Sequence, residues 1–332
     1  MKFSLLIAAS LTCWLAVLPA QAATLPGIQE FIDEMVSRHH FKRKELQRIF
    51  ANAQHRPAVI EAISRSATSR PWPEYRAAFV NPQRIRLGLE FWNKYRSTLR
   101  RAEKRYGVPR EIIIAIIGVE TNYGENAGTF RTIDALTTLA FDYPRRAEFF
   151  RDELEQYLLL AREQRFDPLA LHGSYAGALG IPQFMPSSYR KYAVDFNGNH
   201  KIDLLREPAD AIGSVANYLR GYGWLRSIGK GGDTPARQPV AVLARANEDV
   251  CISETATPRT LAAWSALGVA PRDNLAPDLT ARLLHFTVGE SKEFWLAFNN
   301  FDVITRYNNS DYYAMSVVQL AEALQAAHQA EQ

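Results

Sequence analysis

An uncharged and largely apolar run occupies positions 112–119 and ends directly before Glu120. Isoleucine dominates this run, and β-branched residues taken alone favour a strand. Pro109 stands where a first helical turn begins, and helical patterns flank the run on both sides. We therefore predict a buried helix, which requires a core large enough to surround it.

This prediction places the carboxyl group of Glu120 at the end of an apolar helix, beside the core. Partial burial disfavours the charged form of a carboxyl group and raises its pKa, which a general acid at neutral pH requires. The alternative is a helix-terminal glutamate that simply faces water. The segment by itself does not decide between the two.

Helical periodicity covers most of the chain. Apolar residues recur at spacings of three and four from Leu25 to about Arg105. Two prolines interrupt this pattern at positions 70–75, and because proline breaks helices we expect an irregular connection there, with Tyr75 on or beside a loop. Further helices are predicted at positions 133–139, 145–164, 208–222 and 314–327.

The composition changes between positions 230 and 300. Turn residues fill 230–235, and the segments 240–243, 282–288 and 293–298 have the composition of strands. We therefore predict a mainly α protein with a small β-containing subdomain. The predicted parts are a signal peptide (1–22), an N-terminal helical region (23–105), a helical core that contains Glu120 (106–229), the β-containing subdomain (230–300) and a C-terminal return to the core (301–332).

The N-terminus predicts export. Lys2 supplies a positive charge, positions 5–17 are apolar and uncharged, and the Ala-Gln-Ala sequence at 20–22 fits a cleavage site before Ala23. We expect a periplasmic protein whose mature chain has no transmembrane segment. Cys251 is the only cysteine of that mature chain, which excludes an intrachain disulfide and a cysteine-cluster metal site.

The chain is mildly basic, with 39 Lys and Arg against 35 Asp and Glu and a formal net charge of +4. Basic residues cluster at 39–44 and at 100–105. Such runs are usually solvated helix faces, and in an exported protein they also favour an anionic polymer such as the cell wall. The export signal, together with the lack of an interleaved aromatic and basic motif, argues against a nucleic-acid partner.

Small and neutral polar residues are dense at positions 173–189. Glycines let a backbone approach a ligand closely, and Ser174, Gln183 and several aromatic side chains supply hydrogen bonds and stacking faces. This combination suits a sugar, which carries hydroxyl and amide groups instead of charge. The alternative is close helix packing, for which small residues are also used.

Oxygen-bearing side chains alternate from Asp195 onward and resemble the first half of an EF-hand loop. The fit is incomplete, because His200 replaces the usual glycine and Arg206 occupies the twelfth position, with Glu207 one step beyond. A loop one residue longer closes a calcium site with Glu207. An Asp/Asn-rich turn without metal accounts for the pattern equally well.

These three segments, followed by the segments 210–218 and 300–315, resemble the B-type lytic murein transglycosylases in content and in order. The resemblance extends from about Leu25 to the C-terminus. It implies a lysozyme-like helical catalytic core with a cleft. It also implies that Glu120 is the catalytic residue, and that the substrate-binding positions fall on Ser174, Gln183, Tyr75, Tyr218, Tyr307, Asn308 and Tyr313.

The same resemblance implies one structural calcium ion and no organic cofactor. The family's calcium loop falls on Asp195, Asn197, Asn199 and the carbonyl of Lys201, and Glu207 is the expected closing ligand of the longer loop. The implied partners are peptidoglycan glycan strands, with cell-wall synthesis proteins as further candidates. The sequence lacks the lipid-attachment motif of some relatives, which indicates a soluble periplasmic form.

Ordinary glycosidases use two carboxylates, whereas the resemblance supplies only Glu120. It implies cleavage of the bond between N-acetylmuramic acid and N-acetylglucosamine, with Glu120 as sole general acid and base and a 1,6-anhydro sugar as product. A hydrolytic muramidase is the first alternative, and it needs a second carboxylate such as Glu125, Asp134 or Asp142. A non-catalytic glycan-binding or scaffold protein is the second, and it does not need Glu120.

Overall fold

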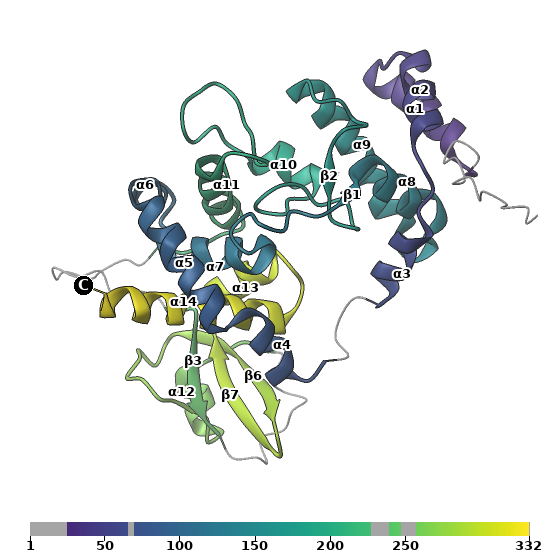
Figure 1. The fold of residues 1–332 in the computed structure, drawn as a ribbon. Helices are drawn as coiled ribbons and strands as arrows, with labels where there is room; N and C mark the ends of the chain where they lie inside the picture. Colours follow the sequence, from purple (N-terminus) through teal and green to yellow (C-terminus); the bar gives the residue numbers. More distant parts are fainter. Residues whose placement is uncertain (1–24, 66–69, 227–238, 247–256, 332) are drawn as a thin grey trace, which may run out of the picture.

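The computed structural model describes residues 25–65, 70–226, 239–246 and 257–331. The predicted signal peptide and Cys251 lie outside these residues. Figure 1 shows a body made mostly of helices, with a small twisted sheet packed against one end of it. Among the described residues, no helix combines the length and the hydropathy needed to cross a bilayer.

The apolar run forms a central helix, α7 (Arg110–Thr121), so the helix prediction is confirmed and a strand at these positions is wrong. All its residues from Glu111 to Val119 are buried, because other helices surround it. The long C-terminal helix α14 (Asp311–Ala330) packs along it, together with α5, α6 and α11. Burial of this kind on every side overrides the strand preference of isoleucine.

The remaining predicted helices are also present. The segment predicted at 145–164 begins with a short 3-10 turn, η2 (Pro144–Arg146), before the α-helix starts. The helices α8 and α9 pack against each other in the part of the body that lies next to α1, α2 and α3 (Figure 1). The helices of this part of the chain are α8 (Thr132–Asp142), α9 (Ala147–Gln164), α10 (Pro186–Tyr192), α11 (Pro208–Gly221) and α13 (Asn299–Thr305).

The helical pattern predicted for positions 25–105 is confirmed, but its helices lie in two places. The first three pack near α8, where Phe31 meets Phe141 edge-on with ring centroids 5.9 Å apart. The next three pack against α7, α11 and α14. The helices are α1 (Ile28–His39), α2 (Arg43–Asn52), α3 (Pro57–Arg65), α4 (Trp72–Phe79), α5 (Pro82–Lys94) and α6 (Arg96–Tyr106).

The expectation of an irregular segment around Tyr75 is wrong. Pro71 precedes α4 and Pro73 lies in its first turn, so Tyr75 is part of the helix. The first N–H groups of a helix have no partner within it. Proline, which lacks an N–H group, is therefore tolerated in the first turn of a helix, whereas it would break the helix further along. Trp72 of this helix is buried and packs on Phe286 of the sheet at 4.6 Å between ring centroids.

The predicted strands are confirmed and form an antiparallel sheet in the order β4-β6-β7-β3-β5. Its central hairpin turns at Gly289, with Val288 opposite Ser291. One face packs under the short helix α12 (Leu261–Ala266), whose Trp264 is fully buried, and the other face joins the main core through Phe286. The strands are β3 (Ala241–Arg245), β4 (Arg259–Thr260), β5 (Ala270–Pro271), β6 (Thr280–Val288) and β7 (Ser291–Ala297).

One close approach inside the core fixes the end of α7. A Cβ placed on Gly118 would lie 2.7 Å from the ring of Tyr123. The Tyr123 hydroxyl donates to the carbonyl oxygen of Arg84 at 2.9 Å, and the Arg84 guanidinium in turn donates to the carbonyl of Gly118. The tyrosine ring therefore has no room to move aside.

We predict that Gly118→Ala destabilises the protein by about 1–3 kcal/mol through overpacking. Helix propensity alone gives the opposite sign, since alanine is favoured over glycine within a helix. Urea unfolding of the variant measures the difference. The same substitution in a Tyr123→Ala background should cost little, and an equal cost in both backgrounds would refute this explanation.

Candidate active site

Glu120 is the penultimate residue of α7 and is partly buried. The helix ends in a sharp turn, because Asn122, Tyr123 and Gly124 follow with φ angles of 51°, 64° and 99°. Such left-handed conformations are costly for residues other than glycine and persist where the surroundings enforce them. The turn carries the chain away from the core and leaves the Glu120 side chain at its edge.

Thr121 fastens this turn to the segment rich in small residues. Its buried hydroxyl donates to the carbonyl oxygen of Ile181 at 2.8 Å and accepts from the N–H of Gly124 at 3.0 Å. A buried hydroxyl that both donates and accepts has its hydrogen-bonding capacity largely satisfied. The end of α7 is thereby held against residues 174–184, which the sequence predicts as a sugar-binding segment.

Among the described residues, the carboxyl group of Glu120 has one hydrogen-bond partner. The Tyr313 hydroxyl, from the first turn of α14, donates to its Oε1 at 2.5 Å. Burial raises the pKa of Glu120 to about 7, and the bond from Tyr313 opposes this rise because it favours the charged carboxylate. At neutral pH the group is therefore poised to release a proton and to take it back.

Four predicted tyrosines surround this carboxyl group. Burial raises the phenol pKa of Tyr75, Tyr218, Tyr307 and Tyr313, and the charge of Glu120 adds to the rise for each of them. Three of the rings form a continuous series, with 4.8 Å between the centroids of Tyr218 and Tyr307 and 6.4 Å between Tyr307 and Tyr313, whereas the Tyr75 ring packs on Tyr312 at 5.6 Å. All four phenols stay neutral, so Glu120 titrates in a shell of uncharged aromatic groups.

A groove of about 610 Å³ opens beside the tyrosines. Four predicted substrate-binding residues line it: Gln183, Tyr218, Tyr307 and Asn308. Glu120 is not itself part of the lining, but its charge acts on Tyr218 and Tyr307, which are. A concave site lined by aromatic rings and a few neutral polar groups has the character of a ligand-binding cleft.

Backbone groups nearby hold the side chains of Ser174 and Gln183 in place. The hydroxyl oxygen of Ser174 accepts N–H groups from Ala176 at 3.2 Å and Ala178 at 3.0 Å, which leaves its proton to donate elsewhere. The Gln183 side chain, whose backbone has a φ of 51°, donates to the carbonyl of Ala127 at 3.0 Å. Both side chains are thus held before any ligand arrives.

None of the second carboxylates that a muramidase would need contributes to the raised pKa of Glu120. Asp134 is 1% exposed and forms an ion pair with Arg131 at 2.7 Å. Asp142 and Glu125 are both exposed to solvent. Within the described residues, burial raises the pKa of Glu120 and the bond from Tyr313 partly offsets this rise.

The groove contains a carboxylate that the sequence did not single out. Glu153 of α9 is 5% exposed, and it accepts the hydroxyl of Ser187 at 2.6 Å and the backbone N–H of Ser187 at 2.9 Å. Its pKa is raised by burial in spite of these bonds. Because it satisfies an N–H group of the first turn of α10, Glu153 joins α9 to α10 along one wall of the groove.

The predicted calcium loop is closed by hydrogen bonds between its side chains. Asp195 accepts the N–H groups of Gly198 and His200, and these bonds lower its pKa although its burial acts in the opposite direction. Glu207 accepts the side-chain amides of Asn197 and Asn199, the latter at 2.9 Å. Asn199 links the two ends of the loop, because its backbone N–H donates to Asp195 at 3.2 Å and its side-chain amide donates to Glu207.

The donor set of this loop fits calcium, which prefers carboxylate and amide oxygens. Across the described residues, no group of three or more His, Cys, Asp and Glu side chains lies close enough to hold a metal ion, so any site here depends on the asparagine oxygens. The side chain of Asp210 anchors the loop to α11, because it accepts the N–H groups of Phe196 at 2.8 Å and Asp203 at 3.0 Å.

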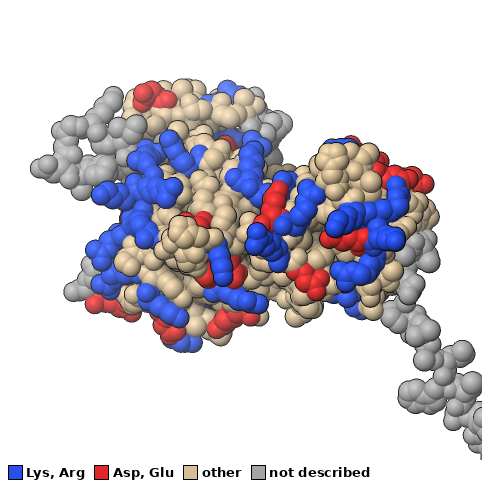
Figure 2. All heavy atoms as spheres, turned by 90° about the horizontal axis from the view of Figure 1, so that it is seen from above, with Lys and Arg blue, Asp and Glu red and all other residues tan. Residues whose placement is uncertain are grey.

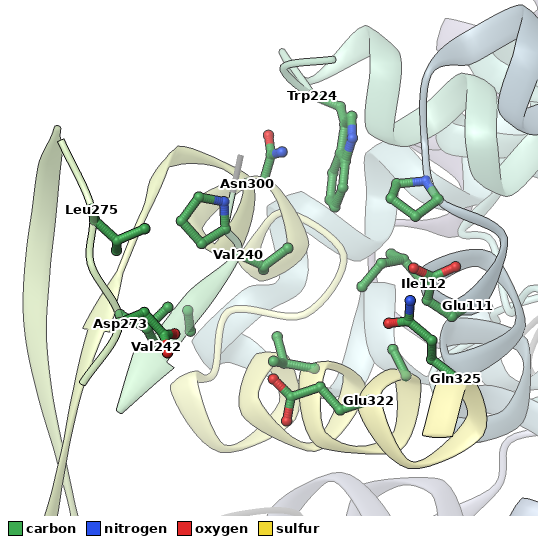
Figure 3. A pocket seen from close by; sticks show the side chains of 15 residues that line it. Glu111, Ile112, Trp224, Val240, Val242, Asp273, Leu275, Asn300, Glu322 and Gln325 are labelled. Carbon is green, nitrogen blue, oxygen red and sulfur yellow. The ribbon is translucent and has the colours of Figure 1, made fainter. Parts of the chain in front are cut away.

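A second cavity, of about 360 Å³, lies at the opposite end of α7 from Glu120 (Figure 3). Trp224 and Asn300 line one side of it, with Glu111 and Glu322 on the other. Burial raises the pKa of Glu322, and the charge of Asp273 adds to the rise. None of the predicted site residues lies in this cavity.

The sequence model of the family described as "Transglycosylase SLT domain" matches residues 24–322. The "Membrane-bound lytic murein transglycosylase B" of Escherichia coli (strain K12) is 44% identical over 315 residues, which are 92% of this chain and 84% of that protein. The chain belongs to the transglycosylase SLT domain family. The resemblance to B-type lytic transglycosylases, and with it the prediction of an enzyme, is confirmed.

Solved structures of relatives agree with the fold of this transglycosylase. The E. coli lytic transglycosylase SLT35 in complex with bulgecin A has a TM-score of 0.85 at 43% identity, with 93% of this chain and 96% of that chain covered. SLT35 in complex with calcium gives a TM-score of 0.84 at the same identity and coverage. SltB3 of Pseudomonas aeruginosa in complex with NAG-anhNAM-pentapeptide gives 0.79 at 31% identity, with 90% and 78% covered. The mainly α, lysozyme-like fold class is confirmed.

Sequence analysis of this transglycosylase missed residues that act through their neighbours. Thr121 directly follows Glu120, and its place at a helix end was the only available signal. Glu153 lies on α9, and the hydrophobic pattern of this helix does not indicate that one of its turns faces a groove. Arg84, which donates to the end of α7, is far from Glu120 in sequence and became visible only in the fold.

We predict that Glu120→Gln stabilises this transglycosylase above pH 7. A pKa of about 7 in the folded state, against 4.5 in the unfolded chain, means that stability is lost as the pH rises through this window. The neutral amide avoids that loss, by up to about 3 kcal/mol at pH 8. Urea unfolding at pH 8 and pH 4 measures it, and an equal difference between variant and wild type at both values would contradict the raised pKa.

Proposed function

We propose that this chain is a lytic murein transglycosylase that cleaves the β-1,4 bond between N-acetylmuramic acid and N-acetylglucosamine and forms 1,6-anhydromuramyl ends. The observation that carries the proposal is Glu120, a carboxyl group with a pKa of about 7 in a shell of neutral tyrosines. Such a group can act as acid and then as base at the same pH. SltB3, a relative, was solved with a sugar–peptide ligand whose name includes an anhydro muramyl unit.

In the first step, protonated Glu120 donates its proton to the glycosidic oxygen as the bond from that oxygen to C1 of the muramyl sugar breaks. The carbonyl oxygen of the sugar's own 2-acetamido group stabilises the positive charge that develops at C1. The substrate thus supplies the group for which ordinary glycosidases use a second carboxylate. The N-acetylglucosamine part leaves with the donated proton on its oxygen.

In the second step, the Glu120 carboxylate removes the proton from the 6-hydroxyl of the same muramyl sugar. The freed oxygen bonds to C1 and closes the 1,6-anhydro ring, and Glu120 is protonated again. The Tyr313 hydroxyl stabilises the carboxylate between the two steps, since a hydrogen bond to the charged form favours that form. No water is consumed, and the buried tyrosine rings help to exclude it.

The other predicted residues take binding roles in this proposal. The Ser174 hydroxyl, which accepts two backbone N–H groups, has a proton available to orient the acetamido carbonyl. Gln183 and Asn308 line the groove and supply neutral hydrogen bonds to sugar hydroxyls. Tyr75, Tyr218 and Tyr307 supply apolar faces on which sugar rings stack.

A hydrolytic muramidase is less well supported, because each carboxylate proposed as its second group is exposed or already paired. A non-catalytic wall protein is also less well supported, since it has no need for a buried acid with a raised pKa. We further propose export to the periplasm, a cleaved signal peptide at 1–22, and peptidoglycan strands and wall-synthesis proteins as partners. The described residues contain no membrane-crossing helix.

We expect the mature chain to release anhydro-muropeptides from purified peptidoglycan. Run in H₂¹⁸O and followed by mass spectrometry, the products should be one water lighter than hydrolysis products and should carry no ¹⁸O. Glu120→Gln should lower the rate by about 10²–10⁴-fold, the usual contribution of a general acid or base. Glu153→Gln is the matched control, as it changes a buried groove carboxylate with a structural role.

Other outcomes of that experiment have clear meanings. Reducing ends that carry ¹⁸O would show a muramidase, and amide variants of Glu125, Asp134 and Asp142 would then locate its second carboxylate. Full activity of Glu120→Gln would remove Glu120 from the chemistry. Binding without release by either protein would indicate a glycan-binding module.

We also propose that the loop 195–207 holds one structural calcium ion, as SLT35 has been solved in complex with calcium. Asp195, Asn197, Asn199 and Glu207 would supply side-chain oxygens and Lys201 its carbonyl. Calcium should then raise the melting temperature of the wild type, and Glu207→Gln should weaken the effect at least tenfold in calcium concentration. Equal titrations of the two proteins, with magnesium as the reference ion, would rule out this site.

A further inference from the structure

The helix α6 carries a stripe of cations on one face. Arg96, Arg100 and Lys104 recur every four residues, so they lie one above another, and all three are exposed. At a rise of ~1.5 Å per residue the stripe is about 12 Å long. It overlaps the basic cluster at 100–105, to which the proposed activity assigns no task.

Ion pairs within the described residues do not neutralise the stripe, whose Arg96 donates only to the neutral side chain of Asn93 at 2.8 Å. No carboxylate of the described chain forms an ion pair with Arg96, Arg100 or Lys104. The one acidic residue of α6, Glu103, pairs instead with Arg110 at 2.8 Å. Like charges four residues apart repel, and Arg96 in the first turn opposes the helix dipole. Both effects disfavour the helix, so the stability of α6 does not explain the stripe.

Further cations and an apolar side chain extend the stripe at its C-terminal end. The Arg226 guanidinium donates to the carbonyl oxygen of Arg105, which places it beside the end of α6. Leu225, next to it, is 43% exposed, one of the few large apolar side chains of the described residues with that much exposure. We call the surface formed by Arg96, Arg100, Lys104, Arg105, Leu225 and Arg226 the basic face.

Figure 2 shows one group of Lys and Arg on the side of the molecule on which α6 lies in Figure 1, and a second group at the end that holds α1 and α2. No residue of α6 is part of the groove lining near Glu120. The basic face is therefore separate from the substrate groove, and all six of its side chains are exposed among the described residues. That ligand must be anionic and extended, since the cations are spread over an open helix surface.

We propose that the basic face binds the surface of an anionic phospholipid membrane. A cluster of several cations attracts anionic headgroups, and an exposed leucine beside them can enter the headgroup layer. Binding of this kind is peripheral and reversible. It does not depend on the proposed cleavage reaction, because it uses none of the residues around Glu120.

Co-sedimentation with vesicles tests the proposal. The mature chain should bind vesicles of 30% phosphatidylglycerol in phosphatidylcholine at 50 mM NaCl, and binding should fall at least tenfold at 500 mM NaCl because salt screens charges. Pure phosphatidylcholine vesicles should not bind it. The variant Arg96→Glu, Arg100→Glu, Lys104→Glu should bind at least tenfold more weakly than the wild type.

A triple variant on and beside the other basic cluster is the matched control. Lys42→Glu, Lys44→Glu, Arg48→Glu makes the same change in net charge at exposed positions on and beside α2. It should keep most of the binding, and Leu225→Ser should lose part of it. An equal loss in the two triple variants would mean that net charge alone drives binding and would overturn the proposal.

Two more measurements separate this proposal from the others. The α6 triple variant should digest soluble muropeptides at the wild-type rate, since its residues lie outside the groove. If it instead loses affinity for purified sacculi while vesicle binding stays unchanged, the basic face contacts the wall and the membrane proposal is wrong. Absence of wild-type binding to the anionic vesicles would also refute it, whatever the outcome of the cleavage experiments.

Discussion

Burial of α7 within a ring of helices is the constraint on which the site depends. Its apolar residues leave α14, α5, α6 and α11 little freedom, because each must cover part of the same helix. The helix stops where Thr121 bonds to Ile181 and the backbone turns through left-handed conformations. Glu120, one residue earlier, is thereby held at the boundary between the core and the groove, where a carboxyl group is deprived of water but still reachable.

The electrostatics of the site follow from what stands around that carboxyl group. Burial disfavours its charge, and the groups nearest to it are phenols that stay neutral. A lysine or arginine in their place would lower the pKa of Glu120, and a second carboxylate would raise it further and share its proton. Neutral aromatic neighbours leave a single group that titrates near neutral pH, and they also provide stacking surfaces for sugar rings. The tyrosines thus keep the pKa of Glu120 near neutral and at the same time offer surfaces for binding the sugar.

The success of sequence analysis depended on whether a signal was local. Helical periodicity and strand composition are properties of short segments, so the elements were predicted well. The exact start of an element was harder to predict. The prolines near Tyr75 suggest a loop, yet Pro71 and Pro73 mark the start of α4. The separation of α1–α3 from α4–α6 had no local signal either, since both groups of helices have the same amphipathic pattern. Glu153 and Arg84 were missed because their partners are distant in the chain.

The sequence by itself determined that the chain is mainly helical, that an apolar helix carries Glu120 at its end, and that the chain resembles lytic transglycosylases. These follow from composition, periodicity and short motifs, which do not need three dimensions. Only the tertiary structure decided that Tyr75, Tyr218, Tyr307 and Tyr313 surround one carboxyl group, and that its pKa is about 7. The physical reason is that a pKa depends on burial and on neighbours in space, and neither is a property of the chain read in order.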